Sequence, residues 1–240
     1  MTTGLNYTQY QTQIVTLGVI DSVTNPNFVT ILPQMITYAE NRIYRDLDFL
    51  FTSTALTGNS LTAGNRNLTI SLDIPGTGNF VVSEQINILT DDGATRNPCL
   101  PVTKEFLDAV CGSSAPANRG LPKYYAAFND NLFLFGPVPD QSYPVEIVGT
   151  YRPDSLSGTN TTTFISTYLP DLFIMASMIF LSGYQRNFGR ANDDPQMAVT
   201  YESQYQALLK GAMVEEARKK YESAGWASMS PAVVASPTRG

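Results

Sequence analysis

Residues 124–135 read YYAAFNDNLFLF, two apolar runs separated by a polar turn at Asn129-Asp130. Two such runs joined by a short polar turn are typical of an antiparallel β-hairpin. Further strand candidates, in which apolar residues cluster or alternate with polar ones, are 68–72, 80–82, 86–88 and 145–151. The pattern predicts an antiparallel sheet or small barrel over residues 51–153, with polar loops at 53–67 and 73–79.

Helical periodicity precedes this region. Tyr7, Tyr10, Ile14 and Leu17 recur at helical spacing, and Gly18 is placed to end a short helix. A second helix is expected to follow Leu32-Pro33, because proline is tolerated in a first turn, and to end near Asp48. Its apolar stripe consists of Met35, Ile36, Ala39, Ile43 and Leu47.

Two more helices are expected after a polar loop at 155–163. The first begins at Pro170-Asp171 and is apolar on all sides over 172–181, which indicates a helix surrounded by protein. The last is capped by Asp193-Asp194-Pro195 and runs to about residue 224, with (i, i+4) charge pairs that predict a solvated distal end. Its stripe is Tyr201, Tyr205, Leu208 and Ala212, and its charge pairs are Glu215–Lys219 and Glu216–Lys220.

These segments predict an α+β fold. A helical bundle is built from residues 1–50 and 154–224, and the antiparallel β region, 51–153, is inserted into it. The remaining residues, 225–240, form an Ala/Ser/Pro-rich tail whose apolar side chains have little to pack against. Fully extended, this tail could reach roughly 50 Å, far enough to enter a neighbouring protein.

Composition excludes several kinds of chemistry. The chain has no histidine, so Ser-His-Asp and Cys-His catalysis is ruled out and the commonest metal ligand is missing. No phosphate-binding glycine motif occurs, and two cysteines, Cys99 and Cys111, are expected to be reduced core residues. A net charge of −6 disfavours tight binding to DNA. We therefore expect no cofactor, no metal and no enzymatic activity.

No targeting segment is expected. The N-terminus lacks a basic region followed by an apolar core, so it does not resemble a signal peptide. The longest apolar run, 172–181, is about half of the ~20 residues that span a bilayer. We expect a protein that is made in a reducing cytoplasm and has no membrane contact.

Two alternatives to a structural role stay open at this point. A carboxylate pair, Glu40 with Asp91 or Asp92, would suit a peptidoglycan-hydrolysing accessory protein. Exposed tyrosines would suit a glycan-binding accessory protein. The hairpin aromatics alternate as core residues do, so we interpret them as core packing; these are Tyr124, Tyr125, Phe128, Phe133 and Phe135.

Several segments, taken in order, resemble a known family. They are Leu32-Pro33 followed by AENRIYRDL at 39–47, LPKYY at 121–125 with LFLF at 132–135 and PVPD at 137–140, the strand 145–153 with Leu156, and LPDL at 169–172. Together they resemble the adaptor family of podovirus-type head-to-tail connectors of bacteriophages, which is similar to tail tubular and tail accessory factor proteins. The resemblance covers about residues 5–222.

The resemblance implies a virion protein at the portal–tail junction. It implies a homo-oligomeric ring, a dodecamer, docked on the portal protein, with tail or nozzle proteins below and genomic DNA passing through without specific binding during ejection. The helical part would build the ring, with Glu40, Arg42 and Arg45 as candidate ring contacts. The C-terminal segment would enter the portal through Trp226, Met229, Val233 and Val234.

Overall fold

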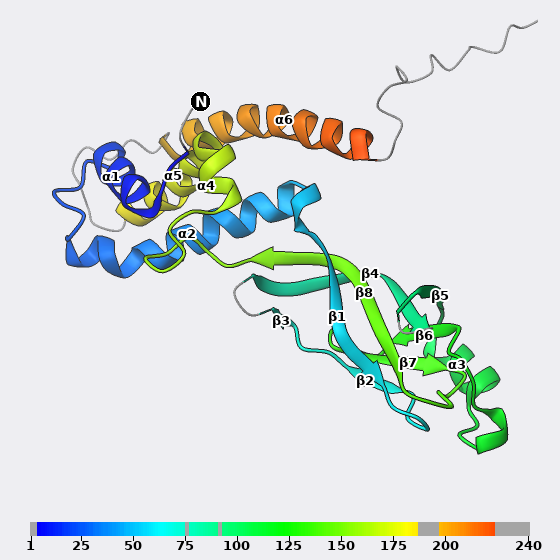
Figure 1. Ribbon diagram of the computed structural model, residues 1–240. Helices are drawn as coiled ribbons and strands as arrows, with labels where there is room; N and C mark the ends of the chain where they lie inside the picture. Colours follow the sequence, from blue (N-terminus) through cyan, green and yellow to red (C-terminus); the bar gives the residue numbers. More distant parts are fainter. Residues whose placement is uncertain (1–3, 75–76, 91–92, 187–196, 224–240) are drawn as a thin grey trace, which may run out of the picture. The chain divides into compact units, whose positions relative to one another are not determined.

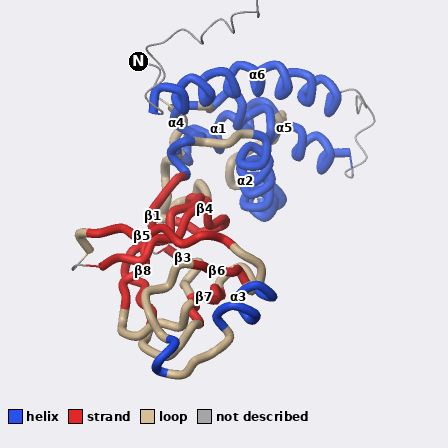
Figure 2. The backbone as a smooth tube through the Cα atoms, turned by 90° about the vertical axis from the view of Figure 1, so that its right-hand side faces the viewer, coloured by secondary structure: helices blue, strands red, loops and turns tan. Residues whose placement is uncertain are grey.

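The computed structural model describes residues 4–74, 77–90, 93–186 and 197–223, and the chain divides into two compact units. The helical unit comprises Met1–Leu50 with Asp154–Gly240, and the sheet unit comprises Phe51–Pro153. Figure 1 and Figure 2 both show the helices of the helical unit and the curled strands of the sheet unit. The structure is therefore of mixed α+β class, as predicted. The predicted tail, 225–240, lies outside the described residues.

The helical unit is organised around α5. Its helices are α1 (Tyr7–Leu17), α2 (Pro26–Asp46), α4 (Phe164–Tyr168), α5 (Pro170–Arg186) and α6 (Met197–Ser223). Figure 1 and Figure 2 both show α5 between α2 and α6. The apolar residues of α5 are largely buried, and the rings of Tyr10 and Phe173 stack with their centroids 4.6 Å apart. The prediction of a helix surrounded by protein is confirmed.

The start of α2 differs from the prediction. The helix begins at Pro26, because the side chain of Asn25 accepts the N–H groups of Asn27 and Phe28 and so satisfies two donors of the first turn. Pro33 lies inside the helix, not at its start. It is exposed, so the Val29 carbonyl that lacks an intrahelical partner faces the solvent side of the helix.

The stripe of α6 also differs in part. Tyr205 and Ala212 are buried as expected, but Leu209 packs into the core in place of Leu208, and the buried stripe continues to Glu216. One face of the distal end is therefore buried, whereas residues 213–215 and 217–218 are exposed, as expected for a solvated end. The predicted cap at 193–195 lies outside the described residues.

The sheet unit is a nearly closed, barrel-like sheet. Its strands are β1 (Ser53–Leu61), β2 (Asn67–Thr69), β3 (Asp73–Ile74), β4 (Gly78–Thr90), β5 (Thr95–Pro101), β6 (Tyr124–Ala127), β7 (Leu132–Gly136) and β8 (Tyr143–Pro153). They pair in the order β1-β8-β4-β5-β6-β7-β2, with β3 on β4, and β2 returns alongside β1. The predicted hairpin is β6–β7, in which Tyr125 pairs with Phe135.

Two features of the sheet depart from the prediction. β1 occupies a stretch expected to be a loop; most of its side chains are exposed or half-buried, so it carries no clear apolar alternation. The pair β5–β6 is parallel, with Leu100 opposite Tyr124, because α3 (Lys104–Cys111) and the turn at Pro116–Asn118 form the crossover between these strands.

The core of the sheet unit fills the inside of the curl. It contains Leu61, Leu68, Ile70, Phe80, Ile86, Ile88, Cys99, Tyr125, Phe133, Phe135, Tyr143, Val145 and Ile147. Core packing of the hairpin aromatics is confirmed for Tyr125, Phe133 and Phe135, whereas Phe128 is 55% exposed. Both cysteines are free, as expected, and burial raises the pKa of the Cys99 thiol to about 12.

One glycine permits a close approach inside the sheet. β4 shifts register against β8 between Phe80 and Val82 and again between Ser83 and Gln85. Gly149 of β8 pairs with Ser83, between the two shifts. A Cβ added to Gly149 would overlap the carbonyl oxygen of Val82. The irregular part of β4 therefore requires glycine at this position.

Candidate functional site

A polar cluster joins α2 to α6. The Arg42 guanidinium donates a 2.6 Å hydrogen bond to Glu202 Oε1, and its Cζ lies 4.2 Å from the centroid of the Tyr205 ring. The Tyr205 hydroxyl donates in turn to Asp46 Oδ2 at 2.6 Å. The hydrogen bond to Arg42 is the main reason why the pKa of Glu202 is lowered. Arg42, predicted as a ring contact, is thus engaged within its own subunit.

Glu40 of α2 is a buried structural carboxylate. Only 3% of the residue is exposed, and its Oε1 accepts the Leu156 N–H at 3.0 Å. Burial raises the pKa of Glu40, while hydrogen bonds from the Leu156 backbone and the Ser155 side chain oppose that shift. This carboxylate holds the chain where it re-enters the helical unit, and it has no open face for a substrate.

Arg45 is the third residue predicted as a ring contact. It lies in the last turn of α2, one residue before Asp46, and is exposed. Its side chain makes no ion pair or hydrogen bond with any residue that the structure describes. Of the three residues predicted as ring contacts, only Arg45 is exposed; Arg42 is half-buried and Glu40 is buried.

The end of α6 holds a second buried carboxylate, which the sequence analysis missed. Glu216 is 5% exposed, and its Oε2 accepts the Leu50 N–H at 3.3 Å. Lys219 Nζ lies 2.8 Å from Glu216 Oε1, and Lys220 pairs with Asp48. Of the two expected charge pairs, Glu215–Lys219 forms, with Lys219 Nζ 2.9 Å from Glu215 Oε1. The spacing of Glu216 from Tyr205, Leu209 and Ala212 was the available signal, because all four share one helix face.

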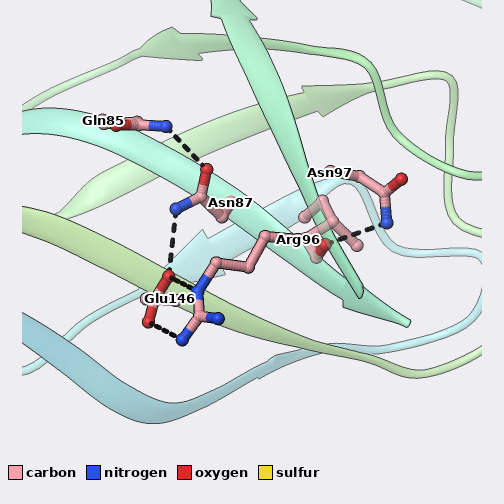
Figure 3. A network of polar contacts seen from close by, with 6 residues as sticks. Gln85, Asn87, Arg96, Asn97 and Glu146 are labelled. Carbon is pink, nitrogen blue, oxygen red and sulfur yellow. Dashed lines mark hydrogen bonds and ion pairs between the residues drawn. The ribbon is translucent and has the colours of Figure 1, made fainter. Parts of the chain in front are cut away.

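A polar network lies on strands β4, β5 and β8 of the sheet unit (Figure 3). Arg96 donates to both carboxylate oxygens of Glu146, from Nε at 2.9 Å and from a terminal nitrogen at 3.2 Å. Asn87 donates to the same carboxylate at 3.0 Å and accepts from Gln85 at 2.9 Å. The Arg96 hydrogen bonds, followed by that from Asn87, lower the pKa of Glu146. This network ties three strands together and leaves the buried carboxylate fully paired.

Exposed apolar side chains gather around α3 and β6. Phe106 and Val110 lie one helical turn apart and are 41% and 61% exposed, and Leu100 and Phe128 are 60% and 55% exposed. Phe106 packs edge-on against Tyr124, and Lys104 Nζ lies 5.5 Å from the centre of the Phe128 ring. Exposed apolar side chains gathered in one place are characteristic of protein interaction surfaces.

The structure offers little support for chemistry. The described residues contain no cluster of three acidic or cysteine side chains that could hold a metal ion. Asp91 and Asp92, the proposed partners of Glu40, lie outside the described residues, as do Trp226, Met229, Val233 and Val234 of the proposed portal contact. None of the described helices combines the length and apolar character that a membrane crossing requires.

Comparison with known proteins gives the family. The family model for the SU10 adaptor protein matches residues 5–234, which spans both the helical unit and the sheet unit. No curated protein matches the chain significantly. This match covers nearly the whole chain and therefore shows the family. The chain belongs to the SU10 adaptor protein family, a family of structural adaptors of bacteriophages.

Proposed function

We propose that the protein is a subunit of the adaptor ring that joins the portal to the tail in a tailed phage of the podovirus type. The observation that carries this proposal is the family match over residues 5–234. The order of the sequence segments resembles that in podovirus-type connectors, and this resemblance supports the same position in the virion. The ring is a dodecamer that assembles in the host cytoplasm and passes the genome through its centre.

The ring interface is built on the outer surface of the helical unit. Arg45 is the direct contact, because its guanidinium is exposed and unpaired among the described residues. Glu40 and Arg42 contribute to the ring interface indirectly, by positioning elements of the helical unit. Glu40 fixes the loop at Leu156, and Arg42 fixes α6 against α2, so that both set the position of the surface that carries Arg45.

The C-terminal segment, residues 225–240, is the portal contact, and the sheet unit faces the next component of the phage tail. This segment carries four large apolar side chains, Trp226, Met229, Val233 and Val234. Burial of such side chains in a groove of the portal would contribute about 1.5–3 kcal/mol each for the aliphatic ones. The exposed apolar group around α3 gives the sheet unit a surface for a tail or nozzle protein. A net charge of −6 suits a passage through which DNA slides without being held.

A binding experiment with purified portal rings tests the proposal. We expect the full chain to bind the portal and to appear in electron micrographs as an added ring. Deletion of 225–240 should abolish binding while the far-ultraviolet circular dichroism is retained. A matched control changes the polar residues Ser228, Ser230 and Ser236 to alanine, which keeps the length and the apolar side chains. Unchanged portal affinity of the deletion variant would contradict the assignment of the tail.

A further inference from the structure

The chain passes between the two units twice, and each passage is held by a buried carboxylate of the helical unit. On the way out, Glu216 Oε2 accepts the Leu50 N–H at 3.3 Å, one residue before the sheet unit begins. On the way back, Glu40 Oε1 accepts the Leu156 N–H at 3.0 Å. Both side chains are almost fully buried, with 5% and 3% of each residue exposed. We call Glu216 the exit anchor and Glu40 the return anchor; they differ in their position within the helical unit.

The return anchor is part of the centre of the unit. Glu40 lies between Ala39 and Ile43 on the buried face of α2, and both of these neighbours are fully buried. Displacing this carboxylate would require α2 to leave the core. The return passage is therefore fixed as long as the helical unit is folded.

The exit anchor stands at the end of a helix. Besides Glu216, Lys219 Nζ lies 2.9 Å from Glu215 and 5.3 Å from the centre of the Phe164 ring. Phe164 packs edge-on against Phe49, with the ring centroids 5.7 Å apart. Lys220 pairs with Asp48. Residues 216–220 thus hold the segment 48–50 through these contacts. We call residues 216–220 the latch.

The latch is continuous with the C-terminal segment. α6 ends at Ser223, three residues after Lys220, and residues 224–240 follow directly. The ends of helices open more readily than their centres, because the final turns lack part of the hydrogen-bond ladder. Any event on residues 224–240 that unwinds or draws out the last turns of α6 also removes the contacts of the latch.

We infer that the latch transmits the state of the C-terminal segment to the link at residues 48–50 that leads into the sheet unit. Opening the end of α6 removes the contacts that hold Asp48 and Leu50, whereas the return passage stays fixed by Glu40. By thermodynamic reciprocity, loosening the link also destabilises the end of α6. The inference holds whichever protein binds residues 224–240, so it does not depend on the portal assignment.

Hydrogen exchange of the full-length protein, followed by mass spectrometry, tests the anchor itself. Glu216→Gln weakens a charge-assisted acceptor, so the exchange of peptides covering 47–52 should accelerate about tenfold. The matched control is Glu215→Gln, which removes a neighbouring carboxylate that contacts Lys219 and is 58% exposed. This control should leave the exchange of 47–52 within twofold of wild type. Equal exchange of 47–52 in both variants and in wild type would overturn the role of Glu216.

A proline substitution tests the transmission. Glu222→Pro breaks the last turn of α6, because proline removes a helical hydrogen bond and clashes with the preceding turn. The control is Ala227→Pro, which introduces proline four residues after Ser223, the last residue of α6. Only Glu222→Pro should raise the exchange of 47–52, by about tenfold, while peptides from the centre of α2 remain protected and show that the unit is folded.

Two outcomes of this comparison would overturn the inference. In the first, the end of α6 exchanges faster in Glu222→Pro while residues 47–52 keep their wild-type protection. In the second, Ala227→Pro and Glu222→Pro have the same effect on 47–52. The reciprocal variant, Asp48→Asn, should accelerate exchange at 216–223, and no change there would contradict the reciprocity.

Discussion

Replacement of Glu40 isolates the contribution of a buried acceptor. Glu40→Leu keeps the bulk of the side chain and removes the oxygen that accepts the Leu156 N–H at 3.0 Å. That N–H would then be left without a partner in a position where Leu156 itself is 2% exposed. A buried donor without an acceptor costs about 1–3 kcal/mol. We expect the free energy of unfolding of the helical unit to fall by about this amount.

Glu40→Gln separates the hydrogen bond from the charge. The amide keeps an acceptor oxygen and removes the ionised group. Burial raises the pKa of Glu40 in the folded protein, so the folded state binds its proton more tightly than the unfolded chain does. Wild-type stability should therefore decline as the pH rises from the ordinary carboxyl pKa through the raised value. In Glu40→Gln this decline should be absent.

Urea denaturation at several pH values measures both effects. The single tryptophan, Trp226, lies outside the described residues, so circular dichroism at 222 nm is the suitable signal for this unit. The expected order of stability at neutral pH is Glu40→Gln at or above wild type and Glu40→Leu below it. If Glu40→Leu were as stable as wild type at every pH, the carboxylate would not be an anchor, and the reasoning would fail.

Two further predictions concern the sheet unit. Gly149→Ala should destabilise it by about 3 kcal/mol or more in urea denaturation, because the new methyl group overlaps the Val82 carbonyl oxygen, whereas Gly120→Ala, which meets no atom within 4 Å, should be nearly neutral. In the wild type, the lowered pKa of Glu146 adds stability above the ordinary carboxyl pKa, and this stability is lost as the pH falls. Arg96→Met should raise the pKa of Glu146 towards the ordinary value. Acid unfolding of this variant should therefore begin at a higher pH than in wild type. Unchanged acid unfolding in Arg96→Met would contradict the role of the network.

Local signals made part of the fold predictable. The β6–β7 hairpin joins strands that are adjacent in sequence, so the turn at Asn129 and the apolar runs beside it contain the information that sets the pairing. The end of α1 at Gly18 and the start of α5 at Pro170 are likewise marked by residues next to the boundary. Such features depend on short-range geometry, which a sequence pattern expresses directly.

Competing or weak signals explain the errors in the fold. Both Asn25-Pro26 and Pro33 resemble a helix start, and the cap provided by the Asn25 side chain decides in favour of the first. β1 pairs with β8, a strand about ninety residues away, and its exposed side chains leave no apolar alternation to detect. The parallel β5–β6 pair arises from a crossover whose geometry no single segment specifies.

The buried carboxylates could not be predicted because their partners are distant in sequence. Glu216 contacts Leu50, which is 166 residues away, and Glu40 contacts Leu156, which is 116 residues away. In the sequence, each is one more glutamate on an amphipathic helix. The same holds for Arg42, whose partner Glu202 is 160 residues away on α6. Only the tertiary structure separates structural charges from surface charges.

Electron cryo-microscopy of the intact virion tests the central claim most directly. Adaptor function predicts that density for both the helical unit and the sheet unit is found in a ring around the axial passage, at the capsid vertex where the portal meets the tail. Density for this chain at any other place, such as the fibres, the capsid lattice or the interior of the head, would contradict the account.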